Sequence, residues 1–155
     1  MSEENQSNTA VLLPKSSIAL FSKDPETADS FQALAQDWRF ARVDIKTHEG
    51  DVESAISHYK TNTSPNLIVI QTEDTGESFT DRLEALGEHC EEETSAIIIG
   101  PVNDVNLYRR LVNMGVSDYL VKPVETQTLA NDIAATLIEQ MGTGESRLIA
   151  IMGAQ

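Results

Sequence analysis

Residues 65–71 read PNLIVIQ, in which four consecutive aliphatic residues stand between asparagine and glutamine. A continuous apolar run of this kind is typical of a strand that is covered on both faces. Residues 18–21 and 96–99 have the same character, whereas residues 40–45 alternate apolar and charged side chains as an edge strand does. A fifth, shorter run occupies residues 119–121. The pattern therefore predicts five strands, three of them buried on both faces.

Helical patterns come after each of these runs. The first begins at Asp24-Pro25, which fits an Asp cap followed by proline at the first helical position. Helical spacing places Ala28, Phe31, Ala35 and Trp38 on one face of this helix. The four later helices have predicted apolar faces made of Val52, Ala55, Ile56 and Tyr59; of Phe79, Leu83, Leu86 and Cys90; of Val105, Tyr108, Leu111 and Val112; and of Leu129, Ile133, Leu137 and Met141.

Five alternations of strand and helix predict an α/β fold with a doubly wound, five-stranded parallel sheet. The expected strand order is 2-1-3-4-5, the flavodoxin-like arrangement, with helices on both faces in three α/β/α layers. Functional sites of this architecture lie at the carboxyl ends of the strands. We therefore expect the candidate site among Ser22 to Asp24, Gln71, Gly100 and Lys122.

Length and composition limit the function. A chain of 155 residues is long enough for one domain, and its net charge of −14 argues against nucleic acid or anionic lipid as a partner. The single cysteine, Cys90, excludes an internal disulfide. Because no apolar run approaches 18 residues and the start is acidic, we expect no membrane insertion, no signal peptide and a cytoplasmic location.

Two strings carry a resemblance to a known family: residues 65–71, and residues 115–123, which read GVSDYLVKP. Over residues 17–141 the chain resembles the CheY-like receiver domain of bacterial response regulators. The resemblance implies a phosphate-accepting aspartate after the third strand and two metal-binding acids after the first. It also implies a serine or threonine after the fourth strand and a lysine after the fifth.

Most of these positions carry a different residue here. The acceptor position is Gln71, the acidic pair falls on Ser22 and Lys23, and the serine or threonine position is Gly100. A neutral amide is neither a nucleophile nor a carboxylate ligand for Mg²⁺. We therefore predict a pseudo-receiver that is not phosphorylated in the usual way. It would have no catalytic residue, no metal site and no enzymatic activity.

Three receiver positions are retained: the switch residue Tyr119 and the pair Lys122-Pro123, whose peptide bond is usually cis in receivers. The Lys122 ammonium is expected to pair with Asp24 or to cap strand-end carbonyls, and anion binding is the alternative. Asp24 is explained as a helix cap, and Asp74 as a solvated loop acid. Both also remain candidate acceptors for a stand-alone response-regulator receiver acting in phosphorelay signal transduction, which is the alternative function.

The ends of the chain lie outside this pattern. Residues 1–16 read as a polar tail that either is disordered or docks locally, and residues 142–146 as a linker. Residues 147–155 resemble the truncated first strand of a following ParA/MinD-type ATPase domain, so ATP and Mg²⁺ are implied only for that domain. A degenerate receiver ahead of such a strand resembles the CpaE/TadZ family of Tad (Flp, type IV) pilus assembly proteins. That resemblance implies an interaction and polar-localisation module with protein partners.

Two further features concern partners. Residues 73–93 hold nine acids and one base, either as a solvated helix face or as a docking surface for a basic partner. Arg109 and Arg110 form a local basic cluster. The receiver resemblance allows a homodimer through the fourth helix, the fifth strand and the fifth helix. A flavodoxin-like protein that binds FMN is disfavoured, because residues 22–25 are too short for its phosphate loop and include an acid.

Overall fold

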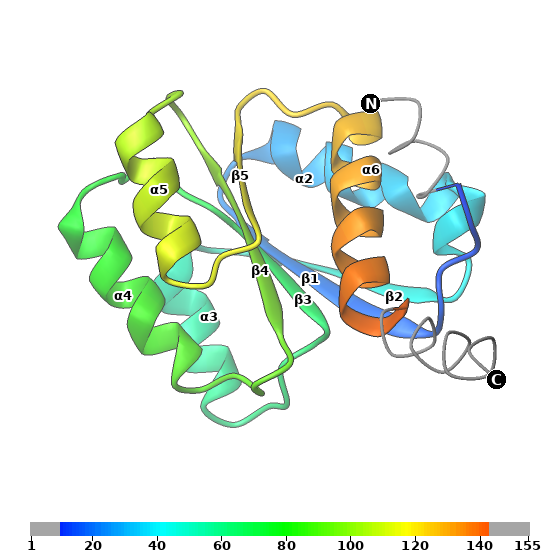
Figure 1. Ribbon diagram of the computed structural model, residues 1–155, viewed down its shortest axis with the longest axis horizontal. Coiled ribbons are helices and arrows are strands. Elements are labelled where there is room, and N and C mark those ends of the chain that lie inside the picture. The colour runs from blue at the N-terminus through cyan, green and yellow to red at the C-terminus, as the bar shows by residue number, and fades with distance from the viewer. Residues whose placement is uncertain (1–9, 143–155) are drawn as a thin grey trace, which may run out of the picture.

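The computed structural model of the chain describes residues 10–142. Its parallel sheet has the strand order β2-β1-β3-β4-β5, as predicted (Figure 1). The strands are β1 (Ser16–Ser22), β2 (Val43–Glu49), β3 (Leu67–Gln71), β4 (Ser95–Gly100) and β5 (Asp118–Val121). The helices are α2 (Pro25–Gln32), α3 (Val52–Tyr59), α4 (Glu77–Gly87), α5 (Val105–Asn113) and α6 (Thr126–Leu137). Shorter turns are the 3₁₀ segments η1 (Ala33–Gln36) and η2 (Trp38–Phe40) and the π-helical turn η3 (Ile138–Gly142).

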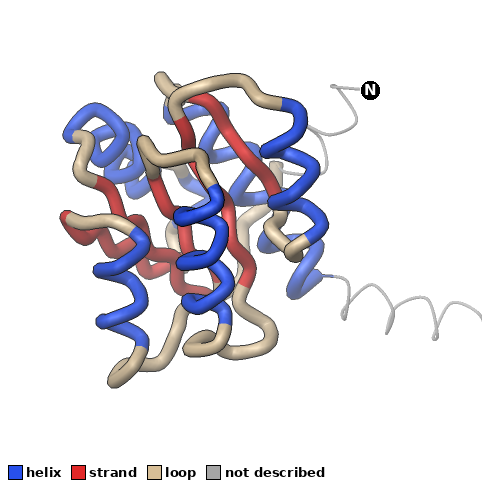
Figure 2. The backbone as a smooth tube through the Cα atoms, turned by 90° about the vertical axis from the view of Figure 1, so that its left-hand side faces the viewer, coloured by secondary structure: helices blue, strands red, loops and turns tan. Residues whose placement is uncertain are grey.

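Helices cover both faces of the sheet, which gives the predicted three layers (Figure 2). On one face, α2, η1 and α6 bury side chains such as Phe31 and Ile133. On the other face, α3, α4 and α5 bury side chains such as Ile56, Leu83 and Leu111. Every residue of β3 is buried, which confirms that its apolar run is covered on both sides.

The first helix is shorter than its pattern suggested. Asp24 caps α2 and Pro25 opens it, as expected, but the α-helix ends at Gln32 and the chain continues in the tighter turns η1 and η2. Because the rotation per residue changes there, the predicted face is wrong beyond Phe31. Leu34 is buried in place of Ala35, and Trp38 is 60 % exposed. The second strand consequently starts at Val43 and not at residue 40.

The buried face of α5 also differs from the prediction. Leu107 and Leu111 are buried, whereas Val105 is 61 % exposed and Tyr108 and Val112 also face solvent. Helical spacing is satisfied by both sets of side chains, and the two leucines are the ones that point to the sheet. The helix ends at Asn113, and the chain turns away at Gly115, whose left-handed backbone has a φ of +102°.

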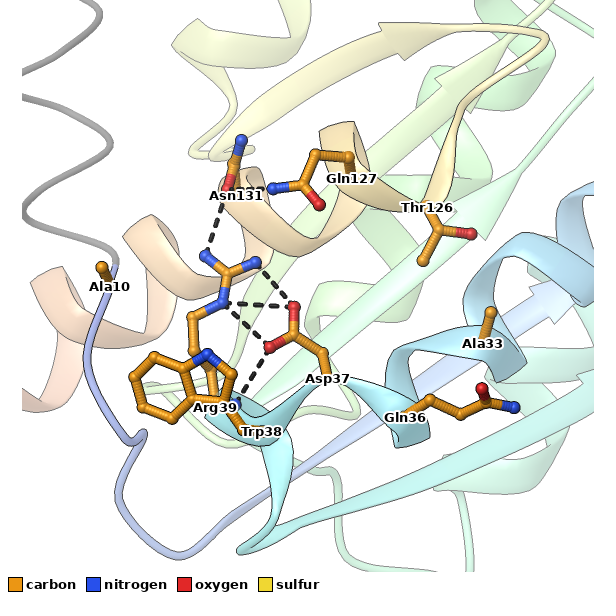
Figure 3. A pocket seen from close by; sticks show the side chains of 9 residues that line it. All are labelled: Ala10, Ala33, Gln36, Asp37, Trp38, Arg39, Thr126, Gln127 and Asn131. Carbon is orange, nitrogen blue, oxygen red and sulfur yellow. Dashed lines mark hydrogen bonds and ion pairs between the residues drawn. The ribbon is translucent and has the colours of Figure 1, made fainter.

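Arg39 ties η2 to α6 below a polar hollow of about 650 Å³ (Figure 3). Its side chain is almost fully buried and makes an ion pair with Asp37, with 2.7 Å between Nη2 and Oδ2. Its Nη1 donates to Asn131 Oδ1 on α6 at 3.1 Å. Hydrogen bonds from Arg39 lower the pKa of Asp37, so the pair stays charged and fixes the chain ahead of β2.

Chain segments outside the strands and helices are also anchored. Leu13 is fully buried, and its N–H donates to the Arg39 carbonyl at 2.9 Å, so this part of the N-terminal segment docks on the domain. Among residues 10–142, no helix has the length and apolar character needed to span a membrane. The remaining predicted segments, residues 1–9 and 143–155, lie outside the described residues.

Candidate functional site

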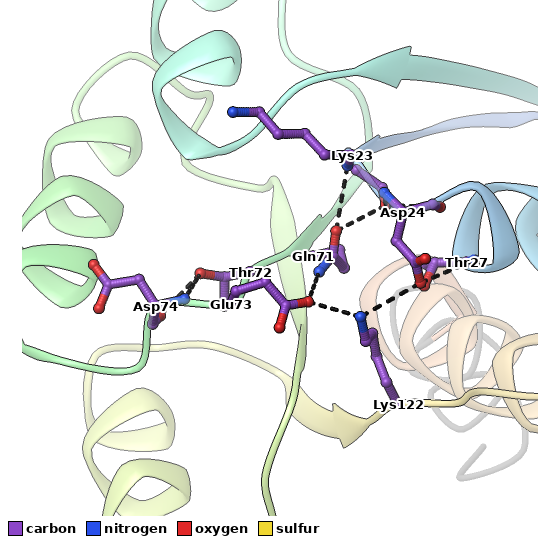
Figure 4. A network of polar contacts seen from close by, with 9 residues as sticks. Lys23, Asp24, Thr27, Gln71, Thr72, Glu73, Asp74 and Lys122 are labelled. Atoms are coloured by element: carbon purple, nitrogen blue, oxygen red, sulfur yellow. Dashed lines mark hydrogen bonds and ion pairs between the residues drawn. The ribbon is translucent and has the colours of Figure 1, made fainter.

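Gln71 is the last residue of β3. It lies at the carboxyl-terminal ends of the parallel strands, beside Ser22, which is the last residue of β1 (Figure 4). Gln71 is only 4 % exposed. Its Oε1 accepts a hydrogen bond from Ser22 Oγ at 2.9 Å and another from the Lys23 N–H at 3.3 Å. Its Nε2 donates to Glu73 Oε2 at 2.7 Å. Both ends of the amide are therefore held, and this buried polar group is satisfied within the protein.

A chain of charges continues from Glu73. Lys122, which comes after β5, donates from Nζ to Glu73 Oε2 at 2.7 Å, and its Nζ lies 3.6 Å from Asp24 Oδ2. The hydrogen bond to Glu73 raises the pKa of Lys122, with the nearby Asp24 charge adding to the effect. The Thr27 hydroxyl, with Lys122, lowers the pKa of Asp24. One ammonium thus lies between two carboxylates, and the predicted pairing of Lys122 with Asp24 is present.

Two other candidate residues point away from this cluster in Figure 4. The Lys23 side chain is exposed and pairs with Asp51, with 3.3 Å between Nζ and Oδ2. Asp74 accepts from the Gly76 N–H at 2.9 Å and from Ser78 Oγ at 2.8 Å, and so supports the start of α4. Gly76 donating to Asp74 lowers the pKa of this carboxyl. Both side chains are surface groups with partners outside the Gln71 cluster.

Gly100 ends β4 directly beneath the Tyr119 side chain. Tyr119 is buried, and its hydroxyl donates to the Val102 carbonyl at 2.6 Å. A Cβ atom on Gly100 would overlap the hydroxyl and the ring of Tyr119. Glycine is therefore the residue that allows the switch-position tyrosine to occupy this inward place.

Replacing Gly100 with alanine tests this packing. We expect a loss of about 2 kcal/mol in the free energy of unfolding, because the tyrosine ring must leave its site or the strand must shift. Urea denaturation of Gly100→Ala measures the loss. Gly87→Ala is the matched control, since a Cβ at Gly87 meets nothing within 4 Å. Equal stability of the two variants would contradict the proposed overlap, and the destabilisation caused by Gly100→Ala should be smaller when it is measured in a Tyr119→Ala background.

The side chains of this site limit the reactions and ligands that it can support. The acceptor position holds an amide, and the two carboxylates nearest to it are already paired with Lys122. Across the described part of the chain, no group of three or more His, Cys, Asp or Glu side chains is arranged to hold a metal ion. The Lys122–Pro123 peptide bond is cis, as the receiver resemblance implied. These residues form a closed polar network at the strand ends.

Glu73 is the member of the network that the sequence pattern missed. It lies in the loop two residues after Gln71, where nothing in the periodicity distinguishes it from Asp74 or from the other acids of this region. Its position relative to Lys122 depends on the path of the loop after β3. The only signal in the sequence for this contact is that an acid follows the end of one strand closely and a lysine follows the end of another.

The fold and the strand-end arrangement define a CheY-like receiver domain of atypical sequence. A CheY-like response regulator receiver domain from Methanospirillum hungatei JF-1 shares the fold at 17 % identity, with a TM-score of 0.66 over 84 % of this chain and 99 % of that one. No family model matches the sequence, and no curated protein does.

Two solved structures of pilus assembly proteins are more similar in sequence to this chain. The pilus assembly protein CpaE from Caulobacter crescentus CB15 is 30 % identical, with a TM-score of 0.77 over 81 % of this chain and 95 % of that chain. A protein described as the CpaE2 pilus assembly protein of Sinorhizobium meliloti 1021 is 37 % identical, with a TM-score of 0.74 over 77 % of this chain and 98 % of that chain. The chain therefore belongs to the CpaE family.

Proposed function

We propose that this chain is a non-phosphorylatable pseudo-receiver that serves as a protein-interaction and localisation module of a Tad (Flp, type IV) pilus assembly protein. The observation that carries the proposal is the buried amide of Gln71 at the acceptor position, held by Ser22 and Glu73. An amide cannot form the acyl phosphate that an aspartate forms. Protein sites usually hold Mg²⁺ through one or two carboxylates, and Ser22 and Lys23 supply none at the positions of the receiver acids.

Surface composition supports an interaction role. Of the nine large apolar side chains that are exposed among the described residues, six gather around one helix, on the loop before α5, on α5 itself and its C-cap, and on β5. They are Val102, Val105, Tyr108, Val112, Met114 and Val121. Exposed apolar groups concentrated in this way are typical of a contact surface. We propose the α5–β5–α6 face as the surface for a homodimer or for a pilus-assembly partner.

The relation to CpaE proteins supports the wider setting. In this proposal the receiver-like domain spans residues 17–141, residues 142–146 form the linker to a second domain, and residues 147–155 begin that second domain, an ATPase. The module would act in the cytoplasm at the cell pole, without an enzymatic activity of its own.

The test is an NMR titration of the ¹⁵N-labelled chain with Mg²⁺ and beryllofluoride, which mimics a phosphoryl group on a receiver aspartate. We expect no shift of the backbone amides of Gln71, Gly100 and Lys122. A triple variant, Ser22→Asp/Lys23→Asp/Gln71→Asp, is the positive control, because it restores the three receiver acids. Specific shifts near β3 in the unmodified chain would overturn the proposal. So would a mass spectrum after acetyl phosphate treatment that places one phosphoryl group on Asp24 or Asp74.

A further inference from the structure

A groove of about 460 Å³ opens between the C-terminal ends of α4 and α5. Its floor is apolar and includes Ile68 of β3, Leu83 and Leu86 of α4, and Val116 ahead of β5. Because Ile68 and Val116 lie near the amino ends of their strands, the groove is at the opposite end of the sheet from Gln71. It is therefore separate from the polar network that replaces the receiver site.

The rim of the groove is acidic. Glu84, Glu91 and Glu92 line it, all three are exposed, and no lysine or arginine is among the lining residues. Within the described chain, none of the three carboxylates takes part in an ion pair or side-chain hydrogen bond. Unpaired carboxylates around an apolar floor attract a cationic group and leave a place for an apolar side chain.

The charge of the chain indicates what kind of occupant fits. A second copy would bring a net charge of −14 to a rim that is itself negative, so self-association is opposed here. A nucleic acid or an anionic lipid surface is opposed for the same reason. A basic, amphipathic protein segment has the complementary chemistry.

We propose that this groove binds a basic amphipathic segment of a partner protein. One large apolar side chain of the segment lies on the floor formed by Leu83, Leu86 and Val116, and its lysines or arginines face Glu84, Glu91 and Glu92. The inference goes beyond the proposed function, because it holds whether or not the strand-end site accepts phosphate. It assigns a use to the acidic region 73–93 that a solvated helix face would not have.

The probe is a fluorescent synthetic helical peptide of leucine and lysine, and a leucine and glutamate peptide of the same pattern is the negative probe. Fluorescence anisotropy with the full chain gives the Kd. In the groove variant Glu84→Lys/Glu91→Lys/Glu92→Lys we expect binding about tenfold weaker, since three rim pairs are lost. The matched control is Glu77→Lys/Asp81→Lys/Glu88→Lys, which has the same net charge but changes exposed acids of the α4 region outside the groove. The control should lose less than about threefold.

A second variant separates the apolar floor from the charge. Gly87 lines the groove, is exposed, and a Cβ atom built on it meets nothing within 4 Å, so Gly87→Leu adds an apolar side chain at the groove without a clash at its Cβ. We expect this variant to keep its melting temperature and to bind the lysine peptide about tenfold more weakly. Equal losses in the two charge variants would overturn the proposal, because only the overall field would then matter. Unchanged binding by Gly87→Leu would overturn it as well.

Discussion

Replacing Gln71 with glutamate is expected to lower the free energy of unfolding by about 3 kcal/mol at pH 8. The substitution keeps the size of the side chain and changes only its chemistry. It removes the N–H donor that Glu73 accepts and places a second carboxylate against it, in a position that is only 4 % exposed. Lys122 already pairs with Glu73 and Asp24, so its charge offsets only part of this repulsion.

The measurement is urea denaturation of Gln71→Glu at pH 8 and at pH 5. Burial and the Glu73 charge should raise the pKa of the introduced carboxyl, so its folded form binds a proton more readily than its unfolded form. The loss of stability is therefore expected to be smaller at pH 5 than at pH 8. A loss that is the same at both pH values would contradict the electrostatic explanation.

A double-mutant cycle with Glu73→Gln isolates the interaction. Glutamine at position 73 removes the second carboxylate and can donate a hydrogen bond to the new glutamate. We expect the double variant to recover at least about 1 kcal/mol relative to the sum of the single variants. If the effects of the two substitutions were additive, repulsion by Glu73 would not be the cause of the stability loss in Gln71→Glu.

The residues of this site differ in how well the sequence predicts their positions. Ser22, Gln71, Gly100 and Lys122 could be placed at one edge of the sheet, because each directly ends or follows a recognisable apolar run and parallel strands end together. Strand order and layers were predictable from the same alternation. Glu73 could not be placed, because the direction of a loop side chain depends on contacts made only after the strands assemble.

Errors arose where two patterns competed. On α5, helical spacing accommodates Val105, Tyr108 and Val112 as well as Leu107 and Leu111, and only packing against the sheet decides between them. After Phe31, the change from α-helix to 3₁₀ turns rotates Trp38 to the surface. Neither outcome is encoded in local periodicity, which measures spacing and not the tightness of the turn.

A further prediction concerns a carboxyl pair on β5 and α6. Asp132 has one oxygen, Oδ2, that is buried without a hydrogen-bond partner among the described residues. Burial, together with the neighbouring Asp118 carboxylate, raises the pKa of Asp132 to about 8. Between a pH of about 4, where an unfolded aspartate titrates, and pH 8, the folded chain holds a proton that the unfolded chain has released. The stability contributed by this group is therefore complete below about pH 4 and decreases as the pH rises to 8.

Asp132→Asn should remove this pH dependence, because an amide resembles the protonated acid at every pH. We expect the variant to be more stable than the natural sequence by about 3 kcal/mol at pH 9, a value reduced from the full pKa shift because Asp118 shares the charge and the side chain is partly exposed. At pH 4 the two proteins should be equally stable. Urea denaturation across this range measures the difference, and Asp29→Asn, at an exposed aspartate of α2, is the control for the change in net charge. If Asp132→Asn and Asp29→Asn gave the same pH profile, the Asp118–Asp132 pair would carry no bound proton and the raised pKa would be refuted.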